Sequence, residues 1–130
     1  MKDLEEAKKF FSNDKYAVDQ TGIEIVAVDD NYSKCSMKIR ECHLNAVKAL
    51  MGAVPYTLAD YSFAIATNSP GHHVVTTNST ITYLSVPKGD TLLSECKLIK
   101  DGRTLCTYEI NITDNLGTKV AIVISNGFKV

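Results

Sequence analysis

A long run with almost no charge, residues 51–67, constrains the fold of this chain more than any other feature. Its sequence is MGAVPYTLADYSFAIAT, in which Asp60 is the single charged residue. A helix that is apolar on most of its faces is a buried helix, so the run predicts a central helix surrounded by other elements. Pro55 suits the first turn of such a helix, where a missing N–H costs little. The Asn-Ser-Pro-Gly segment at 68–71 ends it.

Asp60 is the residue in this run that requires an explanation. Burying an ionised carboxylate without partners is costly. The sequence therefore predicts that Asp60 accepts hydrogen bonds, has a shifted pKa or takes part in chemistry. Thr57, Tyr61 or a neighbouring strand could donate such bonds. At this point a structural and a catalytic explanation both stand.

The segments on either side of the central helix show other periodicities. A short amphipathic helix is expected at about residues 2–12, followed by a hairpin of strands at 23–27 and 35–39 around an Asp-Asp-Asn turn. After the central helix, strands are expected at 74–84, 91–100, 103–113 and 119–129, with turns at 87–90, 101–102 and 115–117. Four successive strands predict an antiparallel meander.

These elements predict one α+β domain over residues 1–130, with a core at about 21–129. An antiparallel six-stranded sheet is expected to wrap around the one long central helix, with the short N-terminal helix at its edge. Such a sheet has exposed edge strands, and pairing with a second copy would cover them. We therefore expect at least a homodimer.

Composition argues against several classes of partner. The formal net charge is −1, and no run of Lys or Arg is long enough to follow a phosphate backbone, so nucleic acid is not expected. The charged N-terminus lacks the apolar core of a signal peptide, and no apolar stretch approaches the roughly 18 residues of a membrane span. A cytoplasmic location without a membrane partner is expected. The four cysteines show no metal spacing with the histidines, so no metal is expected and the thiols are expected to be free and mostly buried.

Several short motifs follow one another in order along the chain. They are Asn45-Ala-Val-Lys-Ala-Leu-Met-Gly-Ala53, Leu58-Ala-Asp60, Thr80-Ile-Thr-Tyr-Leu-Ser85 and Pro87-Lys-Gly-Asp90, followed by an Asp-Gly-Arg turn at 101–103. Over about residues 21–128, this ordered set resembles the hotdog-fold acyl-CoA thioesterases, specifically their phenylacetate-degradation (PaaI-like) branch. The resemblance implies a hotdog fold and hydrolysis of an acyl-CoA to free acid and CoA. It further implies no cofactor beyond the CoA of the substrate, and a homodimer that pairs into a dimer of dimers, a homotetramer.

The resemblance also implies roles for individual residues. The backbone N–H of Gly52 holds the thioester carbonyl at the helix N-terminus, where unpaired N–H groups stabilise an oxyanion. Asp60, as general base or nucleophile, serves the site across the dimer interface. It follows Gly52 by eight residues, about 12 Å along a helix, which is too far for both to reach one carbon. Asn45 orients the thioester or the water, and Thr76 holds the attacking water. The residues implied in substrate and CoA binding are Met51, Ala53, Lys88 and Arg103, with Lys97 and Lys100 as further candidates for the CoA phosphates.

Simpler explanations stand beside three of these roles. Gly52 is also an ordinary helix-start glycine, Asn45 an ordinary turn former and Thr76 an ordinary strand threonine.

The sequence departs from the family pattern at two positions. Met51 stands where the family has a histidine, and Lys48 where it has its first glycine. Methionine offers no useful hydrogen bond, and losing one preorganised donor can cost on the order of 10²-fold in rate. One alternative is therefore a catalytically weakened protein that binds acyl-CoA or an apolar ligand without turnover. Another is a hotdog hydratase or dehydratase that uses His43 with an acidic partner.

Overall fold

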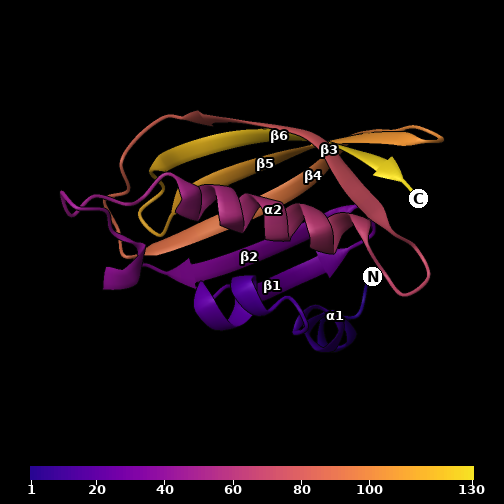
Figure 1. Ribbon diagram of the computed structural model, residues 1–130, viewed down its shortest axis with the longest axis horizontal. Coiled ribbons are helices and arrows are strands. Elements are labelled where there is room, and N and C mark those ends of the chain that lie inside the picture. The colour runs from indigo at the N-terminus through magenta and orange to yellow at the C-terminus, as the bar shows by residue number, and fades with distance from the viewer.

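The computed structural model describes residues 1–130 (Figure 1). The first half contains helix α1 (Leu4–Phe11), a π-helical turn η1 (Tyr16–Gln20), strands β1 (Glu24–Asp29) and β2 (Tyr32–Lys38), a 3₁₀ turn η2 (Glu41–His43) and the long helix α2 (Ala53–Thr67). The second half contains strands β3 (Val74–Tyr83), β4 (Thr91–Asp101), β5 (Leu105–Asp114) and β6 (Lys119–Lys129). The predicted α+β class, both helices and all six strands are confirmed.

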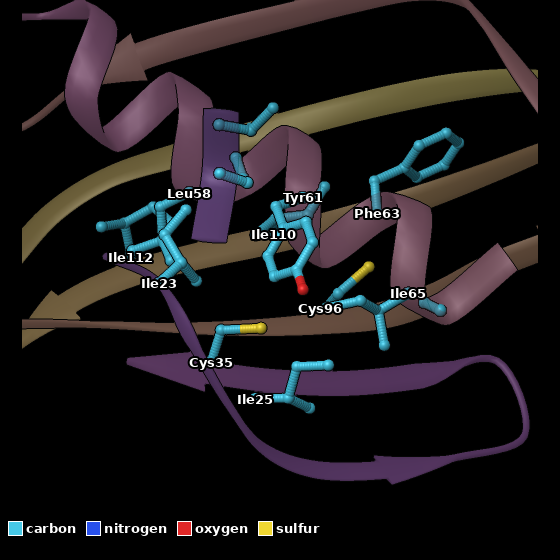
Figure 2. Close-up of a cluster of buried hydrophobic side chains, with 14 of the residues drawn as sticks. Ile23, Ile25, Cys35, Leu58, Tyr61, Phe63, Ile65, Cys96, Ile110 and Ile112 are labelled. Carbon is cyan, nitrogen blue, oxygen red and sulfur yellow. The ribbon is translucent and has the colours of Figure 1, made fainter. Parts of the chain in front are cut away.

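Helix α2 lies across one face of a six-stranded antiparallel sheet (Figure 1). Figure 2 shows Leu58, Phe63 and Ile65 of α2 among side chains from the strands, including Cys96 and Ile110. All five are buried, and this cluster forms the core of the domain. The inward positions alternate along β4, β5 and β6, as the period of a half-covered sheet requires.

The order of strands in the sheet is β1-β2-β4-β5-β6-β3. The prediction of a four-stranded meander is therefore wrong, because among the four strands that follow α2 only β4, β5 and β6 lie side by side in sequence order. Strand β2 pairs with β4, placing Cys35 opposite Ser94. The β1–β2 hairpin thus occupies the outer edge of β4. Strand β3 pairs instead with the free edge of β6, where Ile81 lies opposite Val123. The segment at 84–90, which joins β3 to β4, therefore crosses the three strands β4, β5 and β6 from the β6 side to the β4 side.

The N-terminal segment packs beside β1 and α2 (Figure 1). The Asp3 side chain caps α1 by accepting the N–H of Glu6 at 3.0 Å, and the buried side chains of Ala7 and Phe11 anchor the helix. Turn η1 was not predicted, because five residues are too few to show a helical period. No helix here combines the length and the apolar character needed to cross a membrane. Three of the four unpaired cysteines are buried, as predicted, and Cys42 is exposed.

Candidate active site

The N-terminus of α2 presents two free backbone donors. The N–H groups of Gly52 and Ala53 donate to no acceptor within the chain, whereas the N–H of Val54 donates to the carbonyl of Met51 at 3.0 Å. Pro55 has no N–H. Gly52 and Ala53 are both exposed. Unpaired N–H groups at a helix N-terminus carry partial positive charge, so this end of α2 can stabilise negative charge on a ligand oxygen.

An apolar groove begins beside these donors. It has a volume of about 360 Å³. The Tyr83 hydroxyl closes one side of it by donating to the Gly52 carbonyl at 2.6 Å. A cavity of this size and character suits an apolar chain or ring. Its lining residues are Leu50, Gly52, Pro55, Tyr83, Leu84, Ser85, Val86, Pro87 and Val120.

Asp60 lies on the face of α2 that points away from the sheet, which corrects the expectation that its carboxylate is buried. Ala53 and Asp60 are exposed on this face, and Tyr56, Thr57 and Ala64 are half-buried. The physical reason is the layering of the fold. The sheet covers one side of the helix (Figure 1), and the segment around η1 borders only a flank of the opposite side.

No side chain of the chain donates a hydrogen bond to Asp60. The Thr57 hydroxyl donates instead to the Ala53 carbonyl at 2.9 Å, and the Tyr61 hydroxyl to the Phe11 carbonyl at 3.2 Å. Both donors suggested by the sequence are thus used elsewhere, and the structural explanation for Asp60 finds no support within one chain. Partial burial by its surroundings nevertheless raises the pKa of the Asp60 carboxyl, and the negative charge of Asp14 raises it further.

Two shallow depressions follow one flank of α2, between the helix and η1. The first has a volume of about 260 Å³ and contains Asp60. The second has a volume of about 250 Å³, contains Met51 and Ala53, and shares Tyr16 and Thr57 with the first. Together they connect the start of the helix with its carboxylate. The other residues of the first depression are Asp14, Lys15, Ala17 and Tyr61.

The loop before α2 shows the backbone conformation at one departure from the family pattern, Lys48. Asn45 holds this loop, because its Oδ1 accepts the N–H groups of Val47 and Ala49 at 3.0 and 3.1 Å. Its observed contacts are therefore those of a turn former. Lys48 has a φ of 64°, in the left-handed region where glycine alone avoids a steric cost of roughly 1 kcal/mol. The glycine of the family pattern suits this conformation, and Lys48 adopts it regardless.

His43 and Met51 lie next to each other at the entrance to α2. The His43 carbonyl accepts the Met51 N–H at 2.9 Å. The buried His43 ring accepts the Arg40 N–H on Nδ1 at 2.9 Å and lies 3.0 Å from the Thr21 carbonyl through Nε2. Nε2 therefore carries the proton, and burial lowers the pKa of this imidazole. Since both ring nitrogens hold the loop, His43 has none left for a hydratase-type reaction.

The remaining predicted site residues are widely spread. Thr76 is exposed on the edge strand β3, opposite Gly127 of β6. Lys88 lies in the turn before β4 and Arg103 in the turn after it, so the 11 residues of β4 separate them, roughly 35 Å of strand. One chain does not bring these two cations to the same ligand. Sequence reasoning missed the contact that Tyr83 makes with Gly52, although Tyr83 lies inside a quoted motif.

Known proteins are similar to this chain in sequence and in fold. Residues 48–121 match the family model described as Thioesterase superfamily. The chain is 30% identical over 117 residues to acyl-coenzyme A thioesterase PaaI of Escherichia coli (strain K12), an alignment that covers 89% of this chain and 83% of that protein. The structure of the E. coli PaaI protein superposes with a TM-score of 0.87 at 23% identity, over 98% of this chain and 95% of that one. A Streptococcus mutans UA159 structure bound to acetyl CoA has a TM-score of 0.78 at 28% identity, over 83% and 88% of the two chains. This chain therefore belongs to the thioesterase superfamily, as a PaaI-like hotdog thioesterase.

Proposed function

We propose that this thioester hydrolase cleaves an acyl-CoA to the free acid and CoA. The observation that carries the proposal is the pair of free N–H groups at the start of α2, where Gly52 lines the apolar groove and Ala53 lines the depression that leads toward Asp60. The partner-free carboxylate of Asp60 on the same helix supplies the base. The acyl-CoA thioesterase name of the E. coli relative and the acetyl CoA in the S. mutans structure support the choice of substrate.

The proposed reaction needs only groups of the protein and water. The acyl part occupies the groove, and the thioester carbonyl oxygen faces the N–H groups of Gly52 and Ala53. Asp60 takes a proton from a water molecule while the oxygen of that water attacks the carbonyl carbon. The N–H groups stabilise the oxyanion that forms. Collapse of this intermediate breaks the C–S bond and expels the CoA thiolate, which takes up the proton held by Asp60, so that the carboxylate is restored. A direct attack by the Asp60 carboxylate would need the same ionised form.

The site is complete only in a dimer under this proposal. The helical rise between Gly52 and Asp60 is about 12 Å, so a second chain must bring its own Asp60 to the first chain's donors. The surface available for pairing is the outward face of α2 together with the edge strand β3, where Val75 and Tyr83 are 50% and 54% exposed. An exposed edge favours strand pairing between copies. A dimer of dimers would extend this arrangement.

Binding without turnover is the second candidate function. The observation that favours it is Met51, a residue 53% exposed that lines the depression leading toward Asp60. It occupies the place where a histidine of the family pattern could donate a hydrogen bond, and a thioether cannot donate one. In this case the groove holds an acyl-CoA while hydrolysis is slow.

Thiol release from a panel of short, long and aromatic acyl-CoAs tests the proposal. Hydrolysis of at least one ester above the uncatalysed rate supports it, and the preferred ester identifies the acyl group. Titration calorimetry with the same esters accompanies the assay. Binding without thiol release across the panel would overturn hydrolysis in favour of the second candidate.

The pH dependence of hydrolysis is expected to report the environment of Asp60. Because Asp60 must be ionised, kcat/KM falls in acid as its carboxyl is protonated. Burial and the charge of Asp14 raise that pKa. The acid limb of the pH profile, where kcat/KM falls, is therefore expected at a higher pH than the ordinary aspartate range. Asp14→Asn removes the like charge and is expected to move the limb to lower pH. Asp19→Asn, an exposed carboxylate of η1 outside the depression, is the matched control, and equal shifts in both variants would contradict the expectation.

A further inference from the structure

Tyr83 contacts the peptide group that carries one of the two free donors. Its hydroxyl donates to the Gly52 carbonyl at 2.6 Å, a short distance for such a bond. That carbonyl and the N–H of Ala53 belong to the same peptide group. The N–H of Ala53 has no hydrogen-bond partner in the chain. Tyr83, on strand β3, is thus coupled through one planar amide to a donor at the start of α2.

The chemistry of an amide gives this contact a consequence. A hydrogen bond to the carbonyl oxygen draws electron density toward that oxygen, which makes the N–H of the same amide a stronger donor, and linked hydrogen bonds polarise one another in this way. The contact also fixes the peptide plane, because the planar amide turns as one unit. Oxyanion stabilisation depends on donors that are already oriented when charge develops.

The space around Gly52 supports the same interpretation. Its φ of −58° is an ordinary helical value, so the backbone conformation does not require glycine. A Cβ at this position would lie 2.9 Å from the Tyr83 hydroxyl oxygen and 3.3 Å from Cζ. Any side chain here would therefore push the tyrosine away from the carbonyl. The glycine allows Tyr83 to approach the peptide.

We infer that Tyr83 is a positioning residue for thioester hydrolysis, whose hydroxyl orients and polarises the Gly52–Ala53 peptide so that the Ala53 N–H meets the oxyanion. The inference rests on the proposed function and extends it to a residue on another element. Tyr83 acts through the peptide and gives no proton to the substrate.

Tyr83→Phe tests the inference, because it removes one oxygen atom and keeps the ring in the groove. The expected result is a fall in kcat of about tenfold with KM changed less than about twofold, since the lost polarisation matters most once the oxyanion has formed. A tenfold loss is smaller than that for removing a direct donor. Tyr56→Phe is the matched control. The Tyr56 hydroxyl also joins α2 to β3, donating to the Ser79 carbonyl at 3.0 Å, and its removal is expected to leave kcat within about twofold.

A second measurement does not depend on turnover. In a ¹H–¹⁵N spectrum of the native dimer or tetramer, the Ala53 amide proton is expected to move upfield in Tyr83→Phe and to stay in place in Tyr56→Phe. Equal losses of kcat in the two variants, a change in KM alone, or an unmoved Ala53 resonance would overturn the inference. A native enzyme that hydrolyses esters while Tyr83→Phe retains full kcat would overturn the role of Tyr83 and leave the proposed function intact. A native protein that releases no thiol would overturn both, and the panel assay reveals that outcome before any variant is made.

Discussion

Asp60→Asn is expected to lower kcat/KM for thioester hydrolysis by about 10²- to 10⁴-fold, the range in which general bases contribute. The variant nearly keeps the shape of the side chain and removes its ability to accept a proton. In the chain, Asp60 receives no side-chain hydrogen bond and lies on an exposed helix face, so its loss leaves no buried donor unpaired. Activity should therefore fall without a matching fall in thermal stability, measured by thiol release and by melting of the circular dichroism signal.

The controls for this variant separate chemistry from charge and folding. Asp19→Asn removes the same charge from the neighbouring turn η1 and is expected to retain native kcat/KM. Calorimetric binding of a non-hydrolysable acyl-CoA analogue should be nearly the same in Asp60→Asn as in the native enzyme. Retained hydrolysis in a well-folded Asp60→Asn protein would assign the base to another residue.

Mixing two inactive variants tests whether one site takes residues from two chains. Gly52→Val fills the space next to the donors and displaces Tyr83, so it is expected to be inactive, as is Asp60→Asn. In a heterodimer of the two, one of the two shared sites holds native Gly52 and native Asp60. When the two variant chains re-pair at random, half of the dimers are heterodimers, so about a quarter of the native activity is restored. Heterodimers seen by native mass spectrometry without any recovery would contradict the shared site.

The local structure of this chain could be predicted because its periodicity is strong. The apolar run at 51–67 and the alternation in the later strands give α2 and β3 to β6 nearly at their observed bounds. The partner of β3 could not be predicted in this way, because alternation specifies which face of a strand is buried and carries no information on its neighbour. The hairpin β1–β2 competes with β3 for the edge of β4, and only the folded sheet shows which one pairs there.

The candidate site could be predicted in part for a similar reason. The motif places Gly52 at the start of the helix and Asp60 on it, and both positions are confirmed. The burial of Asp60 was predicted wrongly, because an apolar helix does not reveal whether its cover comes from its own chain or from a partner. The contacts of Asp14 and Tyr83 depend on how η1 and β3 lie against α2, which local patterns do not encode.

A buried carboxylate, Asp114, joins two turns. Asp114 is 2% exposed. Its Oδ2 accepts the N–H groups of Lys88 and Gly89 at 2.8 and 2.9 Å, and its Oδ1 accepts those of Leu116 and Thr118 at 2.9 and 2.8 Å. The segment just before Lys88 lines the groove. Asp114 thus fixes one wall of the apolar groove while lying outside it.

Asp114→Asn is therefore expected to be among the most destabilising conservative changes in the chain. An amide keeps one oxygen and faces the other pair of N–H groups with an NH₂ group, so two charge-assisted bonds are lost and two donors are left unpaired. The melting temperature is expected to fall on the order of 10 °C. Asp90→Asn is the matched control, since this exposed carboxylate of the same turn accepts only from Thr91 and Asn115 side chains. Its melting temperature should stay within about 2 °C of the native value.

The pH dependence of the difference in stability between the native protein and Asp114→Asn distinguishes hydrogen bonds to a charged carboxylate from simple packing. Burial alone raises the pKa of Asp114, but the N–H groups of Gly89, Thr118 and Lys88 outweigh it and hold the pKa well below its usual range. Because the folded pKa lies below the unfolded one, the carboxylate stabilises the fold above the ordinary aspartate range, and this contribution is lost as the pH falls through the folded pKa. The asparagine does not titrate, so the gap between the native and Asp114→Asn denaturation midpoints should narrow in acid. A gap that stays constant from neutral pH into acid would instead assign the loss to packing, because a neutral contact does not respond to protonation.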